Sequence, residues 1–285
     1  MKTTINDVHR INLLLLDEFI RVCEKYNLQW FADSGTLLGA IRHGEIIPWD
    51  DDVDVIMPRE DYNKFLEIAK TEFKAPFFFQ SPETDNYWRV TCKLRYSNST
   101  FFENDSRQIE CMYDNNHGIF IDIFVFDNVP EDDDVFTSEE YFLRFIYNYT
   151  STYLFGHKEK KPTVDCKELF KMINTMLTDI SKANENSKYV ANMFFNKCHK
   201  YMHFKISKDA YSSYTEMNFK GLQHKLRIPK GWREVLELWY GKNWMTPKKY
   251  EASHGEGNSF YDVEHSYDYY KDISLEDFKK LIHLK

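Results

Sequence analysis

The sequence predicts an α/β protein of the α+β type, in which a mixed sheet with flanking helices is followed by a mostly helical region. In the first 130 residues, segments with helical spacing of apolar residues alternate with short runs rich in β-branched and aromatic residues. From residue 137 to about residue 205 the pattern is helical throughout. We therefore expect a sheet-containing core over residues 1–130 and a mostly helical region over residues 131–285 that completes its pocket.

Composition and charge limit the classes of function. The chain has 285 residues, of which 42% are hydrophobic and 17% aromatic, enough for a packed core without long disordered stretches. The formal net charge is -8 and the pI is about 5.7. Non-specific binding to nucleic acid or anionic lipid needs a basic surface, so we expect no nucleic-acid partner.

Cysteine usage and the N-terminus indicate a cellular compartment. The five cysteines are scattered without a CxxC pair that would indicate a redox site, which is typical of a reducing cytoplasm. The start of the chain shows no signal sequence, and its apolar run at residues 13–16 is too short to span a bilayer. We expect a cytoplasmic protein without a transmembrane segment, associated with membranes only through partners.

The chain opens with a predicted amphipathic helix over residues 7–26. Apolar side chains recur there at intervals of three and four residues, which places them on one helix face. Thr4 and Asp7 have the spacing of a capping box at its start. Residues 28–32 then form a predicted short strand, and a brief second helix follows the small residues 34–36.

The next elements follow from β-branched runs and helical spacing. Pro48 and the carboxylates after it separate the second helix from a strand over residues 53–57, which Pro58 closes. A helix is expected over about residues 59–70. Three further strand-like segments follow, at residues 77–80, 89–96 and 118–126.

The second half is predicted to be mostly helical. An acidic stretch from Glu131 to Asp134 marks the boundary between the two regions. Helices are predicted at residues 140–154, 167–180 and 232–240. The polar segment from His254 to Asp272 has no regular pattern, and we expect it to order only around a ligand.

An acidic cluster over residues 50–54 is the main candidate site. Asp52 and Asp54 are separated by one apolar residue at the start of a predicted strand, so both side chains point to one face. Two adjacent hard oxygen ligands suit magnesium bound together with a phosphate group. A solvated acidic turn is the alternative interpretation. A calcium loop is disfavoured because Val55 stands where glycine is required and Asp61 where a bidentate Glu is required.

Two other segments point to the same chemistry. The small residues Ser34, Gly35 and Thr36 lie between a strand and a helix, where backbone N–H groups and hydroxyls can approach a phosphate. Asp122 interrupts an otherwise apolar strand, where an unpaired charge would cost on the order of several kcal/mol. A shared metal would remove this cost. The alternatives are a bond to a neighbouring Arg or Lys, or exposure on an edge strand.

These residues belong to blocks that resemble a known family. The strongest blocks read GTLLGAIRH over residues 35–43 and IPWDDDVD over residues 47–54. Weaker matches follow at KLR (93–95), HGIFIDIF (117–124) and residues 228–241. Together they cover most of the chain and resemble LicD proteins, nucleotidyltransferase-fold phosphocholine transferases related to fukutin and fukutin-related protein.

The resemblance implies a nucleotidyltransferase-type fold and a transfer reaction. Bacterial members move phosphocholine from CDP-choline onto sugars of surface polysaccharides, such as lipopolysaccharide or teichoic acid, and fukutin-type relatives move ribitol phosphate from CDP-ribitol. By this resemblance Asp52, Asp54 and Asp122 would be catalytic and would hold Mg2+, or Mn2+ in its place. The implied donor-binding residues are Ser34, Gly35, Thr36, Arg42, Lys93 and Arg95. Lys93 and Arg95 alternate on one strand, as a diphosphate clamp requires, although exposed basic strand residues also occur without such a role.

The implied reaction is in-line attack of a glycan or glycolipid hydroxyl on the distal phosphorus of the CDP-alcohol, with CMP leaving. Metal would neutralise the phosphoryl oxygens, and Asp122 could accept the proton of the hydroxyl. We expect phosphocholine transfer. The alternatives are ribitol or glycerol phosphate transfer, a non-catalytic glycan-binding member of the fold, and nucleotidyl transfer from CTP or ATP.

Two residue groups have weaker signals. A choline ammonium would need aromatic faces, and the candidates, which could equally pack in the core, are Trp49, Tyr87, Trp88, Trp239, Trp244, Tyr261, Tyr267, Tyr269 and Tyr270. A zinc site is conceivable where one helix face carries two histidines and a cysteine. Its candidate ligands are Cys198, His199 and His203, with His224 or His254. A solvated helix with coincident polar residues is the favoured interpretation.

Overall fold

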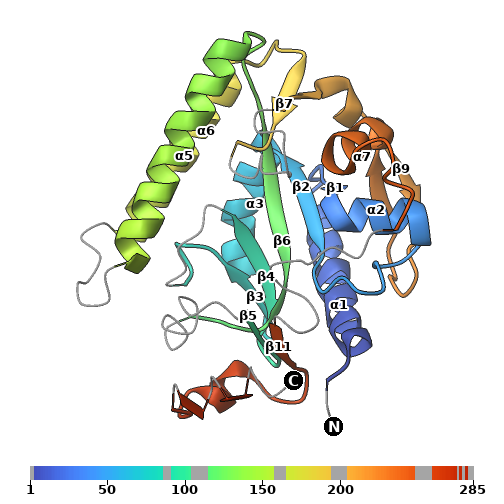
Figure 1. Ribbon diagram of the computed structural model, residues 1–285, viewed down its shortest axis with the longest axis vertical. Helices are drawn as coiled ribbons and strands as arrows, with labels where there is room; N and C mark the ends of the chain where they lie inside the picture. The colour runs from blue at the N-terminus through green and yellow to red at the C-terminus, as the bar shows by residue number, and fades with distance from the viewer. Residues whose placement is uncertain are drawn as a thin grey trace.

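A computed structural model describes residues 3–85, 91–103, 115–156, 165–193, 204–247, 259–274, 276–277 and 280–281, without the side chains of residues 103 and 147–156. It confirms the predicted α/β class. A curled mixed sheet runs through the molecule, and helices lie along its sides (Figure 1).

The main sheet has seven described strands, of which five follow the order β1-β2-β6-β4-β3. The parallel pair β2–β6 lies at its centre, and the other neighbours along this path are antiparallel. The five strands are β1 (Phe31–Ala32), β2 (Asp54–Pro58), β3 (Phe77–Gln80), β4 (Cys92–Tyr96) and β6 (Ile119–Asn128). All five were predicted, and β3 has the predicted bounds. β1 is shorter than predicted because its pairing with β2 involves only two residues.

The helices of the first half also agree with the prediction. They are α1 (Ile5–Lys25), α2 (Ser34–His43) and α3 (Arg59–Glu72). At the start of α1, Thr4 accepts the Asp7 backbone N–H while the Asp7 carboxylate accepts the Thr4 N–H at 2.9 Å, so the predicted capping box is confirmed.

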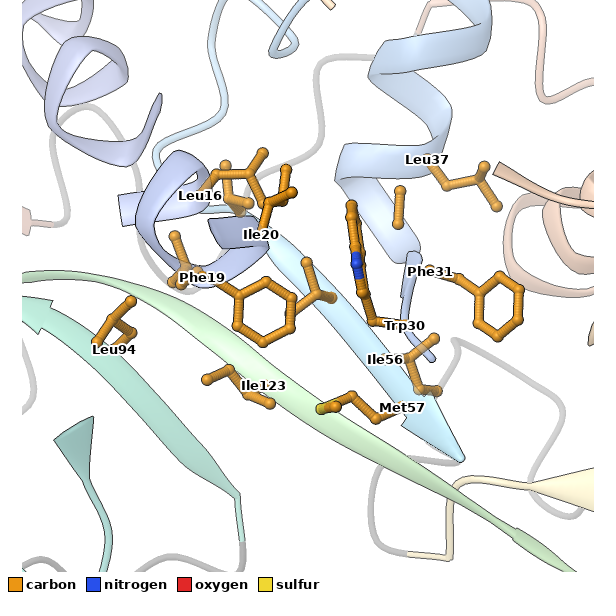
Figure 2. Close-up of a cluster of buried hydrophobic side chains, with 14 of the residues drawn as sticks. Leu16, Phe19, Ile20, Trp30, Phe31, Leu37, Ile56, Met57, Leu94 and Ile123 are labelled. Carbon is orange, nitrogen blue, oxygen red and sulfur yellow. The ribbon is translucent and has the colours of Figure 1, made fainter. Parts of the chain in front are cut away.

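One face of the sheet forms the main core. α1 and α3 pack against β6 and its neighbours. Phe19 of α1 meets Trp30 edge-on at a ring-centroid distance of 5.6 Å, over Met57 and Ile123 of the parallel strands (Figure 2). These side chains are fully buried, and each contributes about 1.5–3 kcal/mol through the hydrophobic effect. The alternate residues of β2 and β6 therefore point to the opposite face.

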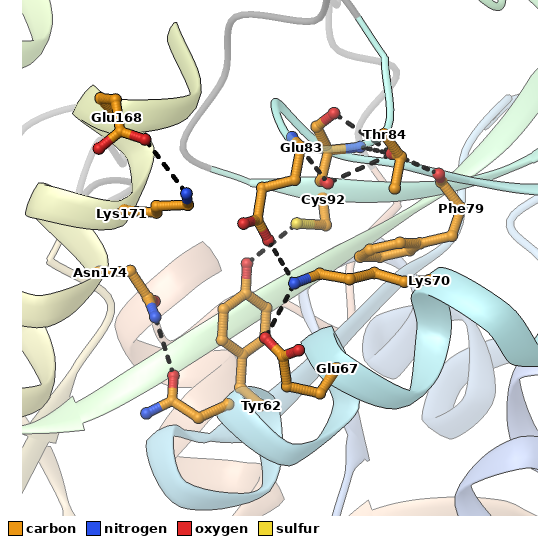
Figure 3. Close-up of polar contacts among 12 residues, drawn as sticks. Tyr62, Glu67, Lys70, Phe79, Glu83, Thr84, Cys92, Glu168, Lys171 and Asn174 are labelled. Carbon is orange, nitrogen blue, oxygen red and sulfur yellow. Dashed lines mark hydrogen bonds and ion pairs between the residues drawn. The ribbon is translucent and has the colours of Figure 1, made fainter. Parts of the chain in front are cut away.

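Polar contacts fix α3 to its neighbours (Figure 3). Its Tyr62 hydroxyl lies 3.2 Å from Sγ of Cys92 on β4, and Lys70 bridges Glu67 and Glu83 at 2.9 and 2.7 Å. At the start of the helix, the buried guanidinium of Arg59 makes a bidentate bond to Asp127 of β6, with N–O distances of 2.6 and 2.9 Å.

The described part of the second half is less helical than predicted and contains several short strands. Its helices α5 (Asp133–Gly156), α6 (Cys166–Ala183) and α7 (Trp232–Tyr240) confirm three predictions. α5 and α6 lie side by side along one edge of the molecule (Figure 1). The predicted helical pattern up to residue 205 is wrong beyond Ala183, because β7 (Tyr189–Ala191) follows and pairs with the end of β6. Among the described helices, none is both long and apolar enough to cross a membrane.

The remaining strands are short, and most of them pair in two-stranded ribbons. They are β5 (Thr100–Glu103), β8 (Ile206–Ser207), β9 (Tyr214–Met217), β10 (Leu226–Pro229) and β11 (Ser259–Asp262). β11, in the segment without a predicted structure, pairs with β5 and so brings the end of the chain to the first half. Two 3-10 turns, η2 (Lys208–Tyr211) and η3 (Tyr267–Tyr270), complete the described elements.

Candidate functional site

Three side chains form a row across neighbouring strands on the face opposite the core. Asp54 of β2 is the register partner of Asp122 of β6, and Lys93 of β4 lies opposite Asp122 on its other side. Asp52, just before β2, completes the cluster, since one carboxylate oxygen each from Asp52, Asp54 and Asp122 lie within 4.8 Å of one another. All three aspartates are partly exposed. The structure thus brings together the three carboxylates that the sequence indicated.

The first turn of α2 positions Asp54. Ser34, Gly35 and Thr36 form that turn, directly after β1 and the N-cap residue Asp33. The Thr36 hydroxyl accepts the Asp54 N–H at 2.8 Å, and the Asp33 N–H donates to the Asp54 carbonyl at 3.1 Å. The positive end of a helix is therefore fixed beside the carboxylate row, where it can attract anionic groups.

Two glycines of α2 allow the acidic loop to lie against the helix. A Cβ at Gly35 would stand 2.5 Å from Oδ2 of Asp50, and a Cβ at Gly39 would stand 2.7 Å from the carbonyl oxygen of Glu45. Both distances are below van der Waals contact. The small residues at these positions of the GTLLGAIRH block thus let the chain run back along α2 to the cluster.

The acidic loop is also held from two distant elements. Asp51 is buried, and its carboxylate accepts a hydrogen bond from the Tyr261 hydroxyl of β11. From α1, Asn12 donates to the Asp51 carbonyl at 2.9 Å, and His9 Nε2 lies 2.7 Å from the Asp50 carbonyl. Sequence reasoning missed these contacts. Asn12 gave a signal as a polar residue beside the apolar stripe of the helix, whereas Tyr261 was only one of several aromatic candidates and gave no signal for this contact.

We expect Tyr261→Phe to lower the free energy of unfolding by about 1.5–3 kcal/mol, because the buried Asp51 carboxylate loses this hydrogen bond. Urea denaturation measures this difference. Tyr269→Phe is the matched control, since Tyr269 is 65% exposed in the same segment. Equal stability of the two variants would contradict the assigned role of Tyr261.

The predicted basic residues lie in different surroundings. Lys93 Nζ is 2.6 Å from Oδ1 of Asp122 and 3.3 Å from the Phe120 ring centroid. The alternative interpretation of Asp122 was a bond to a neighbouring Arg or Lys, and Lys93 makes such a bond. Arg95, two residues along the strand, donates to the Gln80 side chain and to the Gly118 carbonyl, the latter at 2.7 Å. Its guanidinium therefore links β3, β4 and the start of β6.

Arg42 lies away from the carboxylate row. It occupies the last turn of α2, about 12 Å along the helix axis from Ser34. Its guanidinium donates to the Trp244 carbonyl at 3.1 Å. Donor binding by Arg42 and Arg95 stays a prediction, and among the predicted basic residues only Lys93 stands beside the carboxylates.

The electrostatics of the cluster favour a bound cation. Burial, then the charges of Asp52 and Asp122, raise the pKa of Asp54 well above its usual value. Burial raises the pKa of Asp33 to about 6, and its Oδ1 has no hydrogen-bond partner among the described residues. Lys93 offers one positive charge beside the three carboxylates. A hard divalent ion with oxygen ligands would supply further positive charge, so the residues fit such an ion.

Asp33 predicts a pH-dependent stability. Its pKa is near 4 in the unfolded chain and about 6 in the fold, so the unfolded state binds fewer protons between these values and stability falls as pH rises through this window. In EDTA, Asp33→Asn should therefore raise the free energy of unfolding by up to about 3 kcal/mol at pH 8 and by much less near pH 4.5. Denaturation at both pH values tests this. A gain that does not vary with pH would contradict it.

Only some of the residues with weaker sequence signals are described in the structure. His224 Nδ1 lies 2.8 Å from Asp17 and belongs to no candidate metal-binding group among the described residues. Trp239 and Trp244 meet Phe204 and Trp232 edge-on. The other zinc candidates (Cys198, His199, His203 and His254) and two aromatic ones (Tyr87 and Trp88) lie outside the described residues.

A mixed sheet with neighbouring carboxylates on its parallel pair, beside a Ser-Gly helix start, agrees with the nucleotidyltransferase-type fold that the sequence resemblance implies. Residues 27–160 match the family described as LicD/FKTN/FKRP, nucleotidyltransferase domain. Residues 27–160 therefore match a LicD-family domain, as the sequence blocks suggested.

Individual relatives match over parts of their length. The chain is 31% identical over 131 residues to the lipopolysaccharide cholinephosphotransferase LicD of Haemophilus influenzae, covering 46% of the chain and 47% of that protein. Over 53 residues it is 48% identical to the ribitol 5-phosphate transferase FKRP of Homo sapiens, covering 19% of the chain and 11% of that protein. An uncharacterized protein of Rickettsia prowazekii is 37% identical over 76 residues, 27% of the chain and 26% of that protein. The matches thus span about half or less of these relatives.

Proposed function

We propose that the chain transfers phosphocholine from CDP-choline to a hydroxyl of a cell-surface glycan or of its precursor. The observation that carries this proposal is the cluster of Asp52, Asp54 and Asp122 on the site face of a LicD-family domain. The longer of the two matches to named transferases is to a cholinephosphotransferase. This supports choline as the first candidate for the alcohol.

Each part of the site has a role in the proposed reaction. Asp52, Asp54 and Asp122 would hold Mg2+, which neutralises phosphoryl charge when bound. The first turn of α2 directs its N–H groups and positive end toward the diphosphate. The Lys93 ammonium offers a further positive charge beside the row. Asp122 is the carboxylate that we assign to accept the proton of the attacking hydroxyl.

Ribitol or glycerol phosphate transfer is the second candidate. It is favoured by the 48% identity to a ribitol 5-phosphate transferase, although over a short segment. The same site residues would serve, because the alcohol lies beyond the phosphorus that is attacked.

Calorimetric titration of CDP-choline, CDP-ribitol, CDP-glycerol and CTP with Mg2+ would test the proposal. Wild type should bind CDP-choline selectively, and Asp54→Asn should abolish the binding. Phosphorus NMR of a reaction with acceptor should then show CMP and a choline phosphodiester. Selective binding of another CDP-alcohol would transfer the proposal to that alcohol. Pyrophosphate release from CTP, or binding without any product, would contradict it.

A further inference from the structure

A large open groove lies beyond the carboxylate row, at the carboxyl ends of the parallel strands β2 and β6. Its volume is about 1420 Å³, and Pro58 and Phe126, near the ends of these strands, line it together with parts of α3, α6 and η2. Phe126 is four residues beyond Asp122 on β6, and therefore shares its face of the sheet. The carboxyl ends of parallel strands are where open α/β sheets bind ligands.

The groove is basic in an acidic protein. Five basic and three acidic side chains line it, whereas the chain carries a net charge of -8. Arg59 is occupied by Asp127. Lys182 of α6 has no ion-pair partner among the described residues, and Lys208 donates to the Glu185 carbonyl at 2.7 Å without a carboxylate partner among them. These two ammonium groups favour an anionic ligand.

The groove also combines aromatic and hydroxyl groups. Tyr211 stacks on Phe126 at a ring-centroid distance of 4.5 Å and meets Phe31 edge-on at 5.2 Å. Tyr211 is only 8% exposed, yet its hydroxyl has no hydrogen-bond partner within the described ranges. A buried hydroxyl without a partner costs about 1–3 kcal/mol. Ser207 and Ser213 add further hydroxyls to the lining.

We propose that this groove binds an anionic saccharide several sugar units long. Sugars present apolar C–H faces to aromatic rings, here that of Tyr214, which lines the groove and is 37% exposed. Their hydroxyls would meet polar side chains, and acidic groups on them would meet Lys182 and Lys208. The groove exceeds the roughly 300–1,000 Å³ of pockets that hold one small molecule, so an extended ligand fits it better. The carboxylate cluster takes no part, and this inference therefore stands apart from the proposed function.

Calorimetry on the full chain in EDTA tests this inference. The probes are hexagalacturonate and a heparin-derived hexasaccharide, with neutral maltohexaose and inorganic tripolyphosphate for comparison. We expect at least one anionic hexasaccharide to bind, and to bind more tightly than either comparison compound. Lys182→Ala/Lys208→Ala should weaken binding about tenfold, because two favourable charges are removed.

Two further variants separate a site from a general charge effect. Tyr214→Ala should weaken binding several-fold, since it removes a partly exposed ring from the groove lining. Lys171→Ala/Lys225→Ala, which removes the same charge outside the groove, should leave binding unchanged, as should Asp54→Asn.

Several results would overturn the inference. They are no binding of either anionic hexasaccharide at millimolar concentration, equal or tighter binding of tripolyphosphate, equal weakening by the control lysine pair, or loss of binding in Asp54→Asn. The last result would place the ligand at the carboxylate cluster. Failure of CDP-choline binding, by contrast, would overturn the proposed function alone.

Discussion

Asp54→Asn is expected to lower CMP release from the donor by at least about a thousandfold, while the variant in EDTA stays at least as stable as wild type. Asparagine keeps the shape of the side chain but removes the negative charge that would help to hold a divalent cation beside the donor phosphates. In the free protein this charge is unfavourable, because burial and the neighbours Asp52 and Asp122 raise the pKa of Asp54. A functional residue can thus lower the stability of the free fold.

Steady-state CMP release and a thermal melt measure the two halves of this prediction. Asp61→Asn is a suitable control, because Asp61 is a partly buried aspartate of α3 whose pKa is also raised by burial. It should retain wild-type activity. An Asp54→Asn variant with more than a tenth of wild-type activity, or one inactive only because it unfolds, would contradict the assigned role of Asp54.

Removing Asp127 is expected to lower the free energy of unfolding by about 3–5 kcal/mol. Asp127→Leu would leave the Arg59 guanidinium, which is 5% exposed, with Asn174 as its remaining hydrogen-bond partner among those described. A buried charge without its counter-ion is strongly destabilising, whereas replacing both partners with apolar residues of similar size is often nearly neutral.

A double-mutant cycle makes this test specific. The double variant Arg59→Met/Asp127→Leu should be more stable than Asp127→Leu, although it carries one more substitution. Lys64→Ala breaks an exposed pair with Glu60 and should cost less than about 1 kcal/mol. Urea denaturation gives the free energy of unfolding of each variant. If the losses in Arg59→Met and Asp127→Leu simply add up to the loss in the double variant, the pair does not act as a unit.

Local sequence signals were sufficient for much of the fold and for the centre of the site. The Asp-Val-Asp alternation at the start of β2 and the lone Asp122 in an apolar strand both indicated the site face. The LicD-like blocks then related these segments to one another. The parallel register that places Asp54 beside Asp122 agrees with this expectation.

Contacts between distant segments could not be predicted in the same way. Tyr261 reaches Asp51 only because β11 pairs with β5, and four-residue strands leave too short a pattern to detect. Arg95 alternates with Lys93 as expected, but its guanidinium is bound to Gln80 and Gly118 within the sheet. Asp33 was missed because an aspartate before a helix is usually an ordinary cap, whereas here it lies buried beside β2.

Titration with Mn2+, followed by electron paramagnetic resonance, tests the central claim most directly. The claim is that Asp52, Asp54 and Asp122 together hold a divalent cation. We predict that wild type binds one Mn2+ ion, that Mg2+ displaces it, and that Asp54→Asn and Asp122→Asn each lose the site while Asp61→Asn keeps it. Unchanged Mn2+ binding by Asp54→Asn and Asp122→Asn would contradict the account, because the carboxylate row would then not be the metal site.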